Sequence, residues 1–292
     1  MNLAKHAGFG VGLFLVIAQV GAQTITGYEI GKEYTLTQTS STAPVAVSGA
    51  PYDFYARIAG TNLSSLPTPS FTKTNSSSVT SVKDLAFDPT VQKWKFNSSG
   101  NDTPADLSDS FFTSSTAYPF TINGNTATFT FPATDDFVAT HPQITSGTWI
   151  NNSLTFDPTE DYSLNFNSFS PSLSALDSEI RLQITGPGLP SGGLEDVTLG
   201  SVFGNISLLT NLTISANTLQ TNSVYSADLF FLNIEGENTT AVPGITGCAT
   251  YRDDLKFNIA TVPEPADFAA LAGATALALG VLVRRRKVVA QE

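Results

Sequence analysis

A β-hairpin is predicted by the stretch 118–131, Tyr-Pro-Phe-Thr-Ile-Asn-Gly-Asn-Thr-Ala-Thr-Phe-Thr-Phe. Asn123-Gly124 is the preferred centre of a two-residue turn, because both turn positions take a positive φ. After the turn, Ala127, Phe129 and Phe131 alternate with threonines. This alternation gives a strand one apolar and one polar face, as in a half-buried sheet.

The same alternation recurs along the chain. It appears in 52–58 and in 180–184, and further strand candidates are Ile206–Ile214, Val224–Ile234 and Leu255–Ala260. No long amphipathic helical pattern occurs outside the two termini. We therefore expect an all-β fold for residues 23–261: an antiparallel β-sandwich, either one large or two small and immunoglobulin-like.

A short repeat leaves the number of domains open. Leu85-Ala86-Phe87-Asp88-Pro89-Thr90 recurs as Leu154-Thr155-Phe156-Asp157-Pro158-Thr159. Two related modules would explain it, with a boundary near residues 140–150. A common turn at a strand end would explain it equally, with the aspartate capping and the proline fixing φ. We favour the turn.

The N-terminus has the pattern of a secretory signal peptide, residues 1–22. Lys5 supplies the positive charge, Phe9–Ala18 form a short apolar stretch, and Val20-Gly21-Ala22 offers a cleavage site after Ala22. The stretch is short for a membrane span. An uncleaved anchor and a buried helix are the alternatives.

The C-terminus has three parts in a fixed order. Pro263-Glu264-Pro265 precedes an apolar run, 266–283, that is long enough for a transmembrane helix of roughly 27 Å. The basic cluster Arg284, Arg285, Arg286 and Lys287 follows at once. Such a cluster stays cytoplasmic, together with the tail 288–292, so the body is expected to face outward.

This tail, residues 262–287, resembles the PEP-CTERM sorting signal of Gram-negative bacteria. The resemblance implies that an exosortase recognises the tail, cuts near Pro263, Glu264 and Pro265, and delivers the protein to the cell surface or extracellular matrix. Asp267 and the residues beyond Lys287 depart from the family pattern. The alternative is an ordinary C-terminal anchor. A GPI signal fits less well, because its tail ends apolar.

Composition limits the functions of the body. The chain of 292 residues carries a formal charge of −11, and nine of its 14 basic and 22 of its 25 acidic residues lie in 24–262. An acidic body disfavours binding to nucleic acid, which needs a basic face. With 1 Cys, the chain cannot form an internal disulfide or a Cys-based zinc site.

The sequence offers little support for catalysis, and we predict no catalytic residue, metal site or cofactor. His141 and Cys248 have no partners that would make a nucleophilic pair, so we expect a structural or exposed histidine and a buried cysteine. Clustered acidic residues are expected to be solvated, and a calcium-binding loop or a pair of glycosidase carboxylates are the alternatives. The clustered acidic residues are Asp135-Asp136, Glu195-Asp196, Asp253-Asp254, Asp102, Asp106 and Asp109.

Two classes of function remain. The first is a non-enzymatic component of the cell surface or exopolysaccharide matrix. The second is a carbohydrate-binding module or polysaccharide-acting enzyme with the same tail. Aromatic side chains that could stack on sugars, although we expect them mostly in the core, are Trp94, Trp149, Tyr118, Tyr162 and Tyr225. The expected partners are the exosortase and the membrane, with exopolysaccharide as a candidate ligand.

Overall fold

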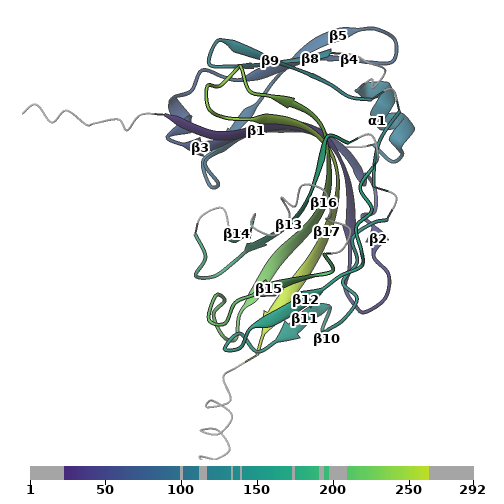
Figure 1. Cartoon of the computed structure of the whole chain (residues 1–292), viewed down its shortest axis with the longest axis vertical. Helices are drawn as coiled ribbons and strands as arrows, with labels where there is room; N and C mark the ends of the chain where they lie inside the picture. The colour runs from purple at the N-terminus through teal and green to yellow at the C-terminus, as the bar shows by residue number, and fades with distance from the viewer. Residues whose placement is uncertain are drawn as a thin grey trace, which may run out of the picture.

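The structure, a computed structural model, confirms a mainly β protein (Figure 1). It describes residues 23–98, 101–111, 117–132, 134–138, 140–172, 175–190, 194–196 and 209–262, without the side chains of 194–196. The main sheet has 11 strands, and eight of them follow one another in the order β14 (Leu194–Asp196), β13 (Asp177–Thr185), β16 (Val224–Asn238), β17 (Gly247–Thr261), β1 (Thr24–Thr37), β3 (Tyr52–Thr61), β7 (Lys93–Asn97) and β6 (Ala86–Asp88). The others are β2 (Val45–Ala46), β10 (Thr148–Ile150) and β11 (Ser153–Phe156).

The main sheet is mixed, so the expectation of a purely antiparallel sandwich is wrong for it. β1 runs parallel to β17, and β11 also runs parallel to β17. The first and last described strands therefore lie side by side in the centre of the sheet. Alternation along each strand carries no information on the direction of its neighbour, which is why the sequence did not show this pairing.

Two smaller sheets cover the main one. One has the order β5 (Thr80–Asp84), β4 (Ser70–Thr74), β8 (Ala117–Ile122) and β9 (Asn125–Thr130), and the other pairs β12 (Tyr162–Asn165) with β15 (Asn211–Ile214). The predicted hairpin is confirmed as β8 and β9, and its turn residues Asn123 and Gly124 have φ of 50° and 81°. Ala127, Phe129 and Phe131 are buried as expected, and the threonines that alternate with them are exposed.

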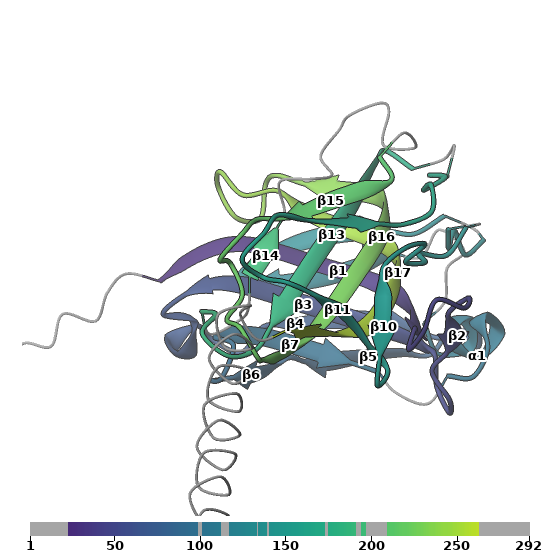
Figure 2. The same ribbon diagram turned by 90° about the horizontal axis from the view of Figure 1, so that it is seen from below.

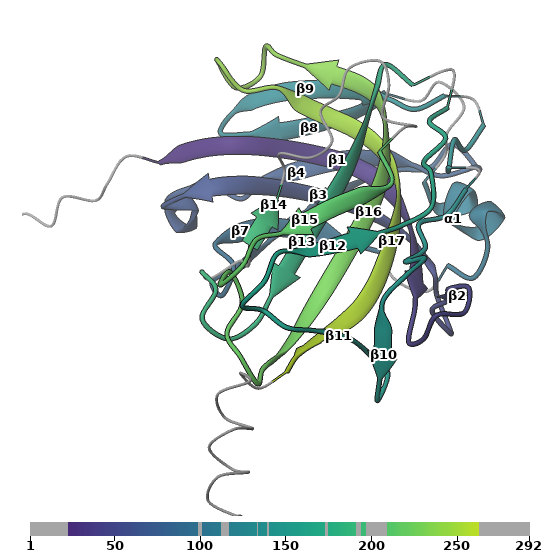
Figure 3. The same ribbon diagram turned by 60° about the horizontal axis from the view of Figure 1, so that its bottom comes forward.

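The long strands β1, β16 and β17 bend in the middle and divide the molecule into an upper and a lower half (Figures 1 and 3). The upper core lies between these strands and the β5-β4-β8-β9 sheet, and its residues include Tyr28, Phe54, Phe120 and Phe129. The lower core is covered by β12 and β15, which cross the main sheet in the view from below (Figure 2). Its residues include Leu164, Leu212, Phe231 and Phe257.

Both cores lie on the same face of the bent sheet. Along β17, Ala249 and Tyr251 belong to the upper core, whereas Leu255, Phe257 and Ile259 belong to the lower one. Because side chains alternate along a strand, the even-numbered residues of β17 point to the opposite face, which we call the inner face. It is the concave side of the bent strands in Figure 1.

Helices are short in the described part of the chain. The η1 turn spans Leu63–Ser65, and α1 spans Pro104–Ser110. The Thr103 hydroxyl accepts from Asp106 N at 3.2 Å and the Asp106 carboxylate accepts from Thr103 N at 3.2 Å, which makes a capping box. Among the described residues no helix is long and apolar enough to cross a membrane, and the predicted span 266–283 lies outside them.

The repeated hexapeptide is a local turn. In both copies the aspartate Oδ1 accepts from the backbone N–H two residues later, Asp88 from Thr90 and Asp157 from Thr159, each at 2.9 Å. The surroundings differ, because β6 pairs with β7 antiparallel and β11 pairs with β17 in parallel. This favours the turn interpretation over two duplicated modules.

Candidate functional site

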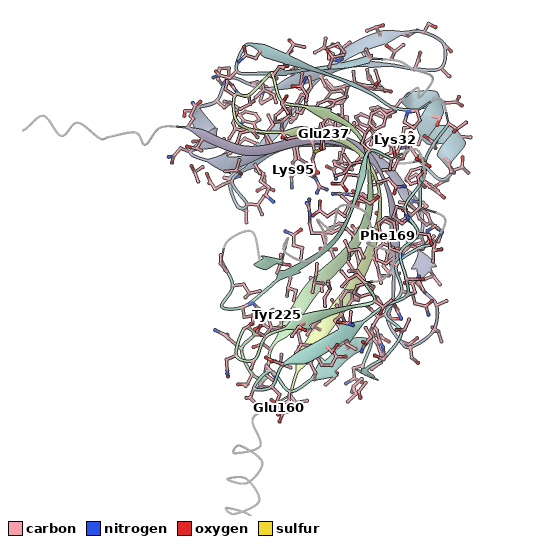
Figure 4. The ribbon with its side chains drawn as sticks, in the orientation of Figure 1. Lys32, Lys95, Glu160, Phe169, Tyr225 and Glu237 are labelled. Atoms are coloured by element: carbon pink, nitrogen blue, oxygen red, sulfur yellow. The ribbon has the colours of Figure 1, made fainter. Side chains whose placement is uncertain are left out.

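The inner face gathers most of the basic residues of this acidic body. Among the nine basic residues of 24–262, all three arginines and three lysines point to it, namely Arg57, Lys93, Lys95, Arg181, Arg252 and Lys256. The assignment follows from alternation, because their neighbours along each strand, such as Trp94, Phe96, Ile180 and Leu182, lie on the core face. In Figure 4 Lys95 lies on the hollow side of the upper half, whereas Lys32 lies at the bend near α1.

A cavity of about 280 Å³ lies on this face, where the N-terminal part of β1 lies near residues of β3, β7, β13, β16 and β17. We call it the inner pocket. Four of the basic side chains line it, Arg57, Lys93, Arg181 and Arg252, together with Glu29, Tyr28, Phe230 and Cys248. Its volume is just below the ~300–1,000 Å³ range of small-molecule pockets.

The floor of the pocket is the buried side chain of Arg252. Only 1% of this residue is exposed, and its guanidinium carbon lies 4.0 Å from the centre of the Tyr55 ring and 5.0 Å from that of Phe230. Arg252 donates from Nε to Glu33 Oε2 at 3.0 Å, and its Nη2 also contacts that oxygen. Burial works to raise the pKa of Glu33, but Arg252 and Arg57 dominate and lower it to about 2.

Close packing holds this floor in place. The hydroxyls of Tyr55 and Thr250 are hydrogen-bonded across β1, and Gly31 lies between them. A Cβ on Gly31 would stand 2.5 Å from Thr250 Oγ1 and 2.7 Å from Tyr55 Cζ. Glycine therefore lets the Tyr55 ring lie over the strand and stack against Arg252.

Arg57 forms one wall of the pocket and has unused donors. Its Nη1 lies 3.8 Å from Glu29 and its Nη2 lies 3.7 Å from Glu33, which are ion-pair distances too long for hydrogen bonds. The guanidinium stacks over Tyr55 at 4.7 Å, and its side chain is 29% exposed. Within the described residues its side chain makes no hydrogen bond, so its guanidinium N–H groups are available at the cavity.

Lys93 extends the same wall. It points to the inner face from β7, two residues before Lys95, and in the described part of the chain its side chain forms neither an ion pair nor a hydrogen bond. Lys95, in contrast, pairs with Asp88 at 2.6 Å. Arg181, which lines the pocket from β13, donates to Glu179 from Nε at 2.9 Å and from Nη2 at 3.0 Å.

Cys248 lies in the pocket but is a poor nucleophile. It is partly buried, and burial, followed by the negative charges of Glu29 and Glu237, raises the pKa of its thiol to about 12. A thiol that stays protonated at neutral pH does not attack or bind metal efficiently. The arrangement of this site suits the binding of an anion rather than covalent catalysis.

A second charged cluster lies at the bend, on the core face. Lys32, which is fully buried, donates to Asp135 at 2.7 Å, and Asp135 also accepts from Ser108 at 2.7 Å and Tyr251 at 3.0 Å. His141 contacts the buried carboxylate of Asp253 through Nδ1. Lys32, Asp135 and Asp253 each have a partner within the protein, so this cluster is part of the folded interior.

Several predictions for single residues can now be assessed. Asp253 and Asp254 are buried, so the expectation of solvated acids is wrong for this pair. The reason is that β17 lies inside the main sheet between β16 and β1, where His141 contacts Asp253 and Lys256 lies 3.0 Å from Asp254. Asp106 caps α1. Among the proposed sugar-stacking residues, Trp94, Tyr118 and Tyr225 are buried in the cores, and Tyr162 stacks on Phe156 at 4.1 Å.

Other predicted sites are not reached. Ala22, Pro263, Glu264, Pro265 and the cluster Arg284, Arg285, Arg286 and Lys287 lie outside the described residues. No group of three or more His, Cys, Asp or Glu side chains in the described ranges is arranged to hold a metal ion.

The sequence analysis missed the inner pocket. Alternation in 52–58 and 180–184 already placed Arg57 and Arg181 opposite the apolar face. It gave no sign that these strands belong to one bent sheet, or that Lys93 and Arg252 lie between them.

Comparison with known proteins adds no function. No protein-family model matches the chain, and no curated protein matches it. Among solved structures, the native conformation of Escherichia coli alpha-2-macroglobulin is similar over 79% of this chain, with 8% sequence identity and a TM-score of 0.21. This chain spans 14% of that one, and a TM-score so low carries no argument.

Proposed function

We propose that this is an exported, non-enzymatic protein of the cell surface or exopolysaccharide matrix, sorted by its C-terminal tail. The observation that carries the proposal is the order Pro263-Glu264-Pro265, apolar run 266–283 and Arg284-Arg285-Arg286-Lys287. In this scheme the signal peptide is removed after Ala22 and the span 266–283 holds the protein in the membrane. An exosortase then cuts near the Pro-Glu-Pro motif.

The described body is compatible with this role. Its buried basic residues Lys32 and Arg252 are paired with Asp135 and Glu33, and burial raises the pKa of the Cys248 thiol to about 12. The last described strand, β17, ends at Thr261, two residues before Pro263. Pro263 and Pro265 bias the residues before them away from helix, which favours an extended, accessible segment for a peptidase.

Intact-mass measurement tests the sorting step. Protein from the native host should end near Pro265, whereas protein made in a host without an exosortase should keep the span through Glu292. A variant with Pro263 and Pro265 replaced by alanine should remain uncut in the native host. If both wild-type preparations end at Glu292, the tail is an ordinary anchor and the sorting proposal fails.

A second candidate function is carbohydrate binding, which the inner pocket favours. Incubation with extracted exopolysaccharide separates the alternatives. Retention without cleavage indicates a binding module, and release of reducing ends indicates an enzyme. If neither occurs, the structural role is left.

A further inference from the structure

We infer that the inner pocket binds the carboxylate group of a compact acidic ligand about the size of one sugar ring, and that Arg57 and Lys93 make the contacts. The inference concerns the body alone and does not depend on how the tail is processed. Nothing in the tail or in the comparisons assigns a ligand to this pocket.

The first argument is the state of the donors. An arginine fork and a lysine ammonium that face one cavity without a hydrogen bond are a ready acceptor site for an oxyanion. Arg57 lies near Glu29, Glu33 and the Tyr55 ring, but at distances too long for hydrogen bonds, which leaves its N–H groups available. Lys93 stands on the adjacent strand, β7, on the same face.

The second argument is the local charge. Around the pocket Arg181 is balanced by Glu179, and the cations Arg57, Lys93 and Arg252 meet the carboxylates Glu29 and Glu33, which leaves one positive charge in excess. Burial opposes ionisation of Glu29, but Arg252 and Arg57 hold its pKa below the ordinary 4.5, so it is charged at neutral pH. A ligand with a single negative charge would balance the wall.

The third argument is shape. A cavity of about 280 Å³ admits one ring-sized group, and Phe230 and Ala59 line it beside the charged residues. The planar fork of Arg57 matches a carboxylate in a bidentate geometry. The exposed Glu237, which lies opposite Cys248 in the sheet, does not line the cavity and would disfavour ligands with several negative charges.

Two sources can supply such a group: a uronate unit of an acidic polysaccharide, or a free small carboxylate. Calorimetric titration of the full-length protein in mild detergent distinguishes them. Sodium galacturonate should bind about tenfold more tightly than galactose, which corresponds to about 1.4 kcal/mol. An oligogalacturonate that binds more tightly than the monomer indicates the polymer as source, and equal affinity indicates the free acid.

Lys93→Gln and Lys95→Gln form a matched pair of variants on one strand face. Lys93→Gln should weaken galacturonate binding about tenfold, since it removes a charged donor without breaking an ion pair. Lys95→Gln should leave the affinity within about twofold, because Lys95 does not line the cavity and is paired with Asp88. Unchanged thermal melting of both variants controls for folding.

The inference is overturned if galacturonate and galactose bind alike or if neither binds. It is also overturned if inorganic phosphate binds more tightly than the carboxylate, or if Lys95→Gln weakens binding as much as Lys93→Gln. Arg57→Gln serves as a further variant only if it melts like the wild type, since Arg57 also compensates Glu29 and Glu33.

Discussion

Removal of the Arg252 side chain tests whether the inner face depends on its buried charge. Arg252→Met keeps the volume of the apolar stem but removes the guanidinium, which is hydrogen-bonded to Glu33. Arg252 is 1% exposed and Glu33 is 5% exposed. Glu33 then loses its hydrogen-bonded partner and keeps only Arg57, whose Nη2 lies 3.7 Å away, too far for a hydrogen bond. Breaking a buried pair in this way typically costs ~3–5 kcal/mol of the free energy of unfolding.

The double variant Arg252→Met/Glu33→Leu makes the test specific. The other acids near Arg252 keep their own bases, because Glu29 lies 3.8 Å from Arg57 and Asp254 lies 3.0 Å from Lys256. No buried charge is then left alone, and replacing a buried pair by apolar residues is often close to neutral. We expect the double variant to regain most of the lost stability.

Urea denaturation at pH 7 measures both effects, with an unchanged slope showing that the unfolded surface is the same. A loss below ~1 kcal/mol for Arg252→Met would show that water reaches the site and that the charge is not buried as described. A double variant whose loss equals the sum of the two single losses would contradict the coupling between Arg252 and Glu33.

Three further predictions concern other parts of the fold. Gly31→Ala should lower the free energy of unfolding by ~1–3 kcal/mol, because its Cβ would collide with Thr250 and Tyr55. Gly27→Ala should cost far less, because its Cβ would have nothing within 4 Å, and urea titration of both variants compares the two losses. The hydrogen bond to Asp253 raises the pKa of His141 above 6.5, and burial raises that of Asp253 to about 6. Asp253 contributes stability that is lost as the pH rises from the ordinary 3.8 to about 6, and His141 contributes stability that is lost as the pH rises from 6.5 through its raised value. Tm should therefore fall from pH 5.5 to 8.5, more steeply than in His141→Gln/Asp253→Asn, which lacks both groups; equal slopes would contradict this. The melting temperature should be the same with and without reductant, since the chain has 1 Cys, and a shift would indicate an intermolecular disulfide.

The sequence by itself determined which residues form many of the strands and which face of each is buried. Asn123-Gly124 marked the hairpin, and the alternations in 52–58 and 180–184 correctly placed the apolar face, because side-chain direction in a strand depends only on the backbone of that strand. The interpretation of the C-terminal tail also rests on the sequence alone, since residues 263–292 lie outside the described part of the chain.

Only the tertiary structure decided how the strands combine. The parallel pairing of β1 with β17, the bend that gives β17 residues to both cores, and the burial of Asp253 and Asp254 depend on contacts between segments far apart in the chain. The inner pocket has the same origin. Arg57, Lys93 and Arg252 are ordinary polar positions of three separate strands, and they become one site because the sheet orders β7, β3, β1 and β17 side by side and turns the same face of each inward.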